Sequence, residues 1–289
     1  MGSAGSTLEG EPRQRGTTVE QLSATDLVAL IVVGLLAGFI NTVAASGGTV
    51  AVPAMIELGL EADLANGTNR LSAMSSSLTA TWRFHQAGVI PWPVTLRLSI
   101  PVGFGALLGA LAASQLNARG AELAVAASLL VVLVLLLARP SRWLAASVEA
   151  PVLRGSLLLS ITLGAIGFWS GFISLGSGSM TLMALVLIGG QSLREANVVK
   201  VVLRLISSGL ALLIFLFRGQ VLWFWAVPLA LASSVGALIG SKVALGEQAS
   251  RWIYNTLLMV IGAEVIRLGL RLDPDPLWRL ALRLWHGAA

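Results

Sequence analysis

Long apolar stretches, separated by short polar breaks, follow one another along most of the chain. A helix needs about 20 mainly apolar residues to cross a bilayer. Stretches near this length lie at about 25–45, 64–86, 93–116, 119–138, 155–175, 192–217, 221–244 and 250–271. The apolar segments at 49–60 and 179–190 are little more than half as long. The pattern therefore predicts an all-α membrane protein with about eight spans and two short segments.

The same landmarks recur in both halves of the chain, in the same order. An offset of 131 residues pairs Gly59 with Gly190, Asn66 with Asn197, Gly88 with Gly219, Trp92 with Trp223, Gly105 with Gly236, and Gly109 with Gly240. An offset of 133 residues pairs Gly34 with Gly167 and Gly38 with Gly171. This ordered series, which includes asparagine and tryptophan, indicates a duplication, and many transporter folds are built from repeated halves.

Polar segments flank the two predicted repeats and define the expected organisation. It comprises an N-terminal tail at 1–24, a first repeat at 25–138, a linker at 139–154, a second repeat at 155–271 and a C-terminal tail at 272–289. The C-terminal tail contains Trp278 and Trp285 together with Arg279 and Arg283. Such a basic, aromatic segment suggests a helix that lies on the inner membrane surface.

Small residues precede each short segment, as Ser46-Gly47-Gly48 in the first half and Ser177-Gly178-Ser179 in the second. Paired short segments with glycine interruptions point to the binding site of a transporter. We therefore expect each to be a re-entrant or broken half-helix. The alternative is that the glycines only permit close helix packing.

The distribution of arginine favours one membrane topology. If the short segments re-enter, each half has four crossings and most arginines collect on the side of the N-terminus. The positive-inside rule then places both termini in the cytoplasm. If the short segments cross instead, the halves are inverted and the arginine bias is weaker, so we expect eight crossings.

Composition assigns the chain to integral membrane proteins. Hydrophobic residues make up 56% of its 289 residues and charged residues 11%, whereas soluble domains carry about 25% charged residues. The chain has no cysteine, and its two histidines, His85 and His286, are far apart. No nucleophile–base pair, metal cluster or nucleotide-binding loop is evident, so we expect no enzyme, metal or cofactor. The net charge of +5 fits arginines in cytoplasmic loops and does not require a nucleic-acid partner.

Polar and cationic side chains interrupt one predicted span in each half. Asn66, Asn69 and Arg70 share one helix face, as Asn197, Lys200 and Arg204 do in the second half. A charge at the bilayer centre costs roughly 2.5–3.5 kcal/mol on insertion scales. Within these two spans no carboxylate lies on either polar face, so two such faces at the repeat interface predict an anion site.

The chemistry of these groups suits an oxyanion. A guanidinium offers a planar fork for two oxygens, and half-helices that begin at the glycine-rich breaks would add amide donors. Two alternatives exist: Arg70 and Lys200 could snorkel to the membrane surface, and Arg204 could pair with Glu264 in the last predicted span.

Several motifs resemble the TauE/SafE family. They are AGFINTVAASGG at 37–48, VPA at 52–54, ANGTNR at 65–70, REANVVK at 194–200, FRGQV at 217–221 and GALIG at 236–240. The resemblance covers about 25–271 and implies a two-repeat permease for sulfite, sulfoacetate and related anions. It also implies substrate-binding roles for Asn66, Thr68, Asn69, Arg70, Asn197, Lys200 and the glycine-rich segments. Asn41 stands where an acidic residue is frequent in the family, which leaves proton coupling open.

We therefore expect a secondary transporter of small, sulfur-containing anions in a bacterial inner membrane, with a passive anion channel or a membrane scaffold as alternatives. Its expected partners are the anion and the lipid bilayer. The candidate substrate-binding residues are Asn41, Ser46, Gly47, Gly48, Asn66, Thr68, Asn69, Arg70, Ser177, Gly178, Asn197, Lys200 and Arg204.

Overall fold

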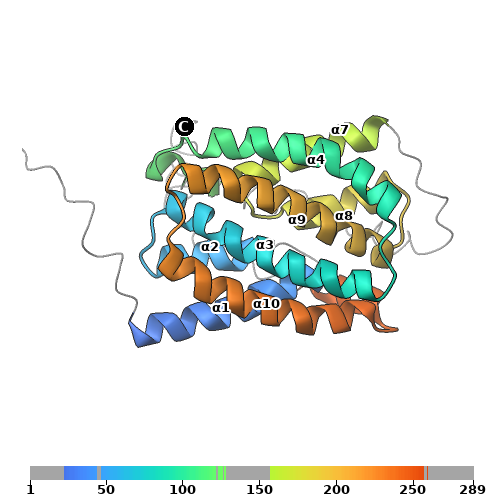
Figure 1. Ribbon diagram of the computed structural model, residues 1–289, viewed down its shortest axis with the longest axis horizontal. Helices are drawn as coiled ribbons and strands as arrows, with labels where there is room; N and C mark the ends of the chain where they lie inside the picture. The colour runs from blue at the N-terminus through green and yellow to red at the C-terminus, as the bar shows by residue number, and fades with distance from the viewer. Residues whose placement is uncertain are drawn as a thin grey trace, which may run out of the picture.

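The computed structural model describes residues 23–43, 47–121, 123–125, 127, 157–256 and 259. All regular elements in these residues are helices, as expected (Figure 1). The labelled helices are α1 Ala24–Val43, α2 Gly48–Glu57, α3 Ala62–Gln86, α4 Trp92–Ala113, α7 Leu157–Phe172, α8 Ser177–Leu187, α9 Leu193–Phe217 and α10 Trp223–Leu245. Residues 118–121 and 249–256 are helical as well. Most of the spans expected at 119–138 and 250–271, the linker and both tails lie outside the described residues.

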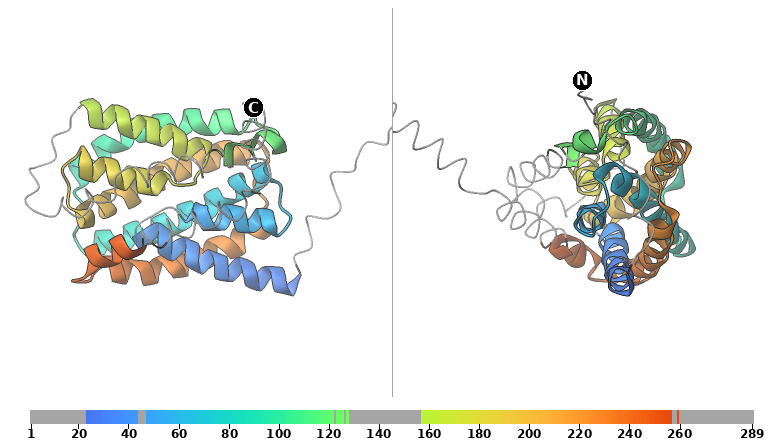
Figure 2. Two further views of the ribbon diagram at one scale, coloured as in Figure 1. Left: turned by 180° about the vertical axis from the view of Figure 1, so that it is seen from behind. Right: turned by 90° about the vertical axis from the view of Figure 1, so that its left-hand side faces the viewer.

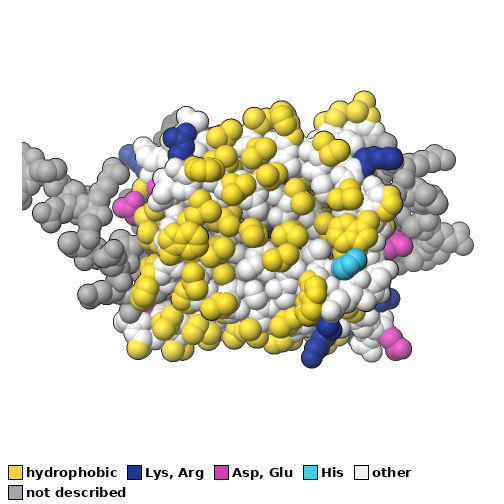
Figure 3. Space-filling model, viewed as in Figure 1, with side chains coloured by type: hydrophobic (Ala, Val, Ile, Leu, Met, Phe, Trp, Pro, Cys, Tyr) yellow, Lys and Arg dark blue, Asp and Glu magenta, His cyan; other side chains and the backbone are white. Residues whose placement is uncertain are grey.

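The described helices form a bundle with an apolar outer surface. By length and composition, α1, α4, α9 and α10 are able to cross a membrane. The 25-residue α3 is equally long but carries the polar Asn66–Arg70 segment, which lowers its hydropathy. Figure 3 shows hydrophobic side chains over the middle of the visible face and charged side chains toward its two ends. An apolar band between polar ends is the surface expected of a protein in a bilayer.

Glycines at equivalent positions of the two halves end equivalent helices. Gly59 and Gly190 follow α2 and α8, and Gly88 and Gly219 follow α3 and α9; all four have φ between 66° and 99°. Only glycine adopts this left-handed conformation without a steric cost. At Gly88 the amide binds the His85 carbonyl, and the Val89 amide binds the Phe84 carbonyl, which is a Schellman motif.

The other repeated glycines bring the two halves together. On α1, a Cβ added to Gly38 would lie 1.9 Å from the Ser233 carbonyl oxygen of α10. On α4, a Cβ added to Gly109 would lie 1.9 Å from the Phe168 carbonyl oxygen of α7. The first helix of each half therefore packs backbone to backbone against a long helix of the other half, α1 against α10 and α7 against α4, as small residues permit in membranes.

The two groups of four helices run in opposite directions. Gly67, near the start of α3, lies against Phe215 near the end of α9. Phe84, near the end of α3, shares a hydrophobic cluster with Val198 near the start of α9. The helices α3 and α9 are therefore antiparallel, although the repeat makes them equivalent.

Each short helix reverses the helix before it. In Figure 1, α1 begins at the left-hand end and α2 runs back to that end, whereas α7 begins at the right-hand end and α8 runs back there. Figure 2 shows the same two pairs from behind. We expected eight crossings, four in each half, which would make the halves parallel. The antiparallel α3 and α9 instead match the inverted orientation of the alternative, although α2 and α8, with 10 and 11 residues, are too short to cross as that alternative required. Gly47 permits the reversal, since an added Cβ would lie 2.1 Å from the Ala37 carbonyl oxygen.

Candidate functional site

The helices α1 and α7 both end inside the bundle, where their last carbonyl groups need hydrogen-bond donors. Each end receives them from the polar helix of the opposite half. The Asn66 amide of α3 donates to the Phe172 carbonyl at the end of α7, at 2.9 Å. The Asn197 amide of α9 donates to the Thr42 carbonyl near the end of α1, at 3.0 Å. The repeated asparagines therefore serve as matching helix caps.

Arg70 extends the cap on α7. Its guanidinium donates to the carbonyls of Ser170 and Gly171, with the second contact at 2.8 Å, and to Asn66 Oδ1 at 2.9 Å. It also lies over the Phe215 ring, 5.1 Å from the centroid. The side chain is fully buried, so the snorkelling alternative is wrong for Arg70. A cation at a helix C-terminus interacts favourably with the carbonyl dipoles, and this contact occupies most of its donors.

Lys200 makes the corresponding contact on α1. Its ammonium nitrogen lies 3.0 Å from the Asn41 carbonyl oxygen, and the side chain is fully buried. Snorkelling is therefore wrong for Lys200 as well. Unlike Arg70, Lys200 also lines a pocket.

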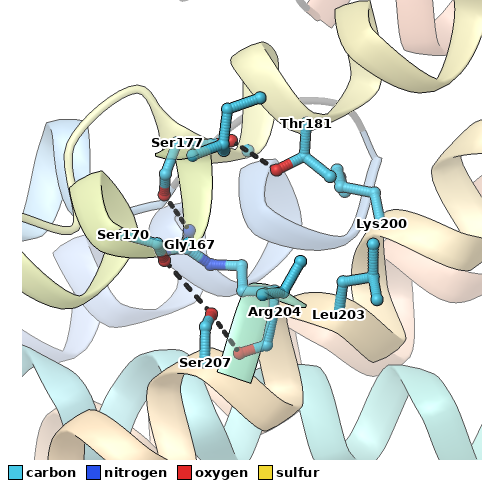
Figure 4. Close-up of a pocket in the computed structure, with 11 residues that line it drawn as sticks. Gly167, Ser170, Ser177, Thr181, Lys200, Leu203, Arg204 and Ser207 are labelled. Atoms are coloured by element: carbon cyan, nitrogen blue, oxygen red, sulfur yellow. Dashed lines mark hydrogen bonds between the residues drawn. The ribbon is translucent and has the colours of Figure 1, made fainter. Parts of the chain in front are cut away.

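A small pocket of about 10 Å³, room for roughly one water molecule, lies between α7, α8 and α9, with one wall from α4 (Figure 4). Its polar lining consists of Ser170, Ser177, Thr181, Lys200, Arg204 and Ser207, together with the backbone of Gly167 and Gly178. The remaining lining residues are Val102, Ile166 and Leu203. Two cations and several hydroxyl groups thus share one small, buried space.

Arg204 is held in this pocket by two serine hydroxyls. One terminal nitrogen donates to Ser177 Oγ and the other to Ser174 Oγ, both at 2.9 Å. Its Nε is buried and has no hydrogen-bond partner among the residues that the structure describes. Among the described residues no carboxylate pairs with Arg204, and Glu264, the partner considered from the sequence, lies outside them.

The start of α8 faces the same pocket. Its N-cap, Gly176, has φ of 68° and provides no side-chain cap. The amides of Ser177, Gly178 and Ser179 precede the first hydrogen bond within the helix, from Met180 to Gly176. Unpaired amides at a helix start attract anions.

The other candidate residues divide between the pocket's surroundings and the packing of the bundle. Asn69 donates to Ser174 Oγ at 3.2 Å, and a Cβ on Gly48 would approach both groups. Thr68 instead accepts a hydrogen bond from the Leu222 amide at 3.1 Å. Asn41 donates from its side chain to Ser76 and Ser77. Ser46 lies outside the described residues.

The pocket therefore brings together Ser177, Gly178, Lys200 and Arg204 from the candidates, and it excludes the Arg70 guanidinium. Sequence reasoning missed Ser170, Thr181 and Ser207. Ser207 follows Arg204 by three residues and Thr181 follows Ser177 by four, so helical spacing from the chosen residues would have found both. Within the described part of the chain, no three His, Asp and Glu side chains are grouped as metal ligands would be.

Comparison with known proteins identifies the class. Residues 30–265 match the family described as "Sulfite exporter TauE/SafE", and the chain belongs to this family. Together with its apolar helices, this membership makes it a multi-pass membrane protein.

Curated relatives resemble nearly the whole chain. "Probable membrane transporter protein ORF9" of Sinorhizobium sp is 29% identical over 262 residues, which is 90% of this chain and 97% of the relative. "Probable membrane transporter protein YfcA" of Escherichia coli strain K12 is 28% identical over 243 residues, 83% of this chain and 89% of the relative. A "Probable membrane transporter protein" of Haemophilus influenzae is 29% identical over 76% of this chain and 86% of its own length. No solved structure matches the chain significantly.

Proposed function

We propose that this protein is a secondary transporter that binds a small oxyanion in the pocket between α7, α8 and α9. The observation that carries the proposal is the burial of Lys200 and Arg204 side by side with no carboxylate partner among the described residues. An unpaired buried charge costs several kcal/mol. A bound anion would offset that cost for both cations at once.

The donors of the pocket fit an anion with several oxygens. Among the described residues Arg204 Nε has no acceptor, and the start of α8 lines the same space. The hydroxyls of Ser177, Thr181 and Ser207 donate to backbone carbonyls in the structure, and they can rotate to donate to an anion instead. A sulfite or sulfonate group presents three oxygens that could accept from these different directions. The preference for sulfur anions rests on the family description, "Sulfite exporter TauE/SafE", and the transport role on the names of the relatives.

The membrane arrangement that we propose is a pair of inverted halves, at about 25–138 and 155–271, joined by the linker at 139–154. The antiparallel α3 and α9 and the matching caps on α1 and α7 support it. In inverted-repeat transporters, the binding site lies near the middle of the membrane between broken helices, and the halves rock to open either side. The broken pair α7 and α8 carries this pocket. The location of both termini in the cytoplasm of a bacterial cell stays a prediction.

The test is binding of a panel of anions to the purified protein: sulfite, sulfate, thiosulfate, methanesulfonate, sulfoacetate, taurine, acetate and chloride. A ligand that binds only the folded state raises the thermal midpoint as its concentration exceeds the dissociation constant. We expect a selective shift with a sulfur oxyanion, and its loss in Arg204→Gln.

Arg97→Gln is the matched control, because Arg97 is exposed on α4 and should leave the shift intact. The same variants are then compared for uptake of the identified anion into proteoliposomes. An equal shift and equal uptake by wild type and Arg204→Gln would refute the site. Binding with uptake that never saturates would instead favour a passive channel.

A further inference from the structure

Lys200 has fewer hydrogen-bond acceptors than a charged ammonium group can use. An ammonium carries three N–H donors, whereas Nζ has one acceptor in the structure, the Asn41 carbonyl oxygen at 3.0 Å. A neutral amine has only two N–H groups, so the empty pocket suits the neutral form better than the charged form.

The charges around Lys200 favour the same conclusion. Among the described residues, Arg204, which lies on the same helix and lines the same pocket, is the charged group close enough to interact with Lys200. Among the described residues that line the pocket, α4, α7 and α8 contribute only hydroxyl, backbone and apolar groups. On the α1 side Lys200 meets the Asn41 carbonyl, and the guanidinium of Arg70 on α3 is held at the end of α7. Among the described residues, a second positive charge in this space has no negative partner until an anion enters.

Arg204 cannot share this behaviour, because a guanidinium stays protonated under ordinary conditions. Arg204 therefore carries a permanent charge, whereas Lys200 is able to gain and lose its proton.

We propose that the pocket binds its anion together with one proton, which Lys200 Nζ carries. The anion supplies both the negative charge and the acceptors that an ammonium needs there. The proton comes from the solution on the side where the anion enters, binds the lone pair of Nζ, and returns to solution when the anion leaves on the other side. This inference rests on the proposed function and makes the protein a proton–anion symporter.

Calorimetric titration of the purified protein tests it. Sulfite, sulfate and methanesulfonate are titrated in two buffers of different ionisation enthalpy, which gives the number of protons taken up per bound anion. We expect about one more proton for wild type than for Lys200→Arg, whose charge is permanent. Subtracting the variant removes any proton exchanged by the anion itself. Above the pH at which Lys200 becomes neutral, wild-type affinity should fall about tenfold per pH unit relative to the variant.

If the larger side chain of Lys200→Arg prevents folding, Lys200→Met takes its place in the comparison. Lys242→Met, at an exposed position of α10, is the control. We expect Lys200→Met to bind more weakly without the pH dependence, and Lys242→Met to match wild type. If the anions bind but wild type and the Lys200 variants take up equal numbers of protons, this inference fails and the proposed function stands. If none of the anions binds wild type, both fail.

Discussion

At the scale of single residues, three buried cations of similar appearance in the sequence have different roles in the structure. Arg70 donates to the carbonyls at the end of α7, Lys200 divides its contacts between the end of α1 and the pocket, and Arg204 lies in the pocket. Burial alone therefore does not identify a substrate ligand. The acceptors around each cation decide its role, and for Arg70 these are protein carbonyls.

Replacing Arg70 with methionine should reduce stability rather than anion binding. The variant leaves the buried carbonyls of Ser170 and Gly171 without their donor, and hydrogen bonds to a charged group are worth about 1.5–3 kcal/mol each. We expect a lower thermal midpoint in detergent, with the anion-induced shift retained. Arg97→Met, at an exposed site, is the control and should have a wild-type midpoint. A wild-type thermal midpoint without the anion-induced shift would mean that Arg70 binds the anion.

At the scale of helices, the repeated glycines determine how closely the two halves approach. The crossings of α1 with α10 and of α4 with α7 place glycine against a backbone carbonyl. The sequence repeat identified these glycines as equivalent. The structure explains the equivalence, because in each crossing a glycine of one helix lies against a backbone carbonyl of the other helix. Gly88 and Gly219, which end α3 and α9, belong to the same series of repeated glycines.

Gly109→Ala should destabilise the bundle, whereas Gly209→Ala should not. A Cβ at position 109 would lie 1.9 Å from the Phe168 carbonyl oxygen, but at position 209 its nearest neighbour is Met74 Sδ at 3.8 Å. Overpacking costs about 1–3 kcal/mol, while alanine in a helix gains up to about 1 kcal/mol over glycine. Thermal unfolding of both variants in the same detergent measures the difference. Equal midpoints would contradict the prediction and mean that α4 and α7 can move apart without a loss of stability.

At the scale of the whole molecule, α3 and α9 run antiparallel, which supports the inverted halves proposed above. This arrangement puts a polar helix of each half at the end of the broken helix of the other half. The binding site proposed here therefore needs both halves, although its two cations come from the second.

Labelling of single cysteines distinguishes inverted from parallel halves, and the chain has no native cysteine to remove. The exposed positions Gln86, Arg194, Glu61 and Arg218 are each changed to cysteine in turn. With inverted halves, a membrane-impermeant maleimide should reach Gln86→Cys and Arg194→Cys from one side, and Glu61→Cys and Arg218→Cys from the other. Parallel halves with eight crossings would instead pair Gln86→Cys with Arg218→Cys.

The sequence by itself determined the membrane class, the bounds of most described helices, and the polar faces of α3 and α9. These properties depend on neighbouring residues, through the length of an apolar run or the spacing of polar residues along one helix. Only the tertiary structure decided the direction of the short helices and the separate roles of Arg70, Lys200 and Arg204. Arg70 binds a carbonyl 100 residues away and Lys200 one 159 residues away. The free energy of a buried charge depends on such distant partners, which only the folded chain brings together.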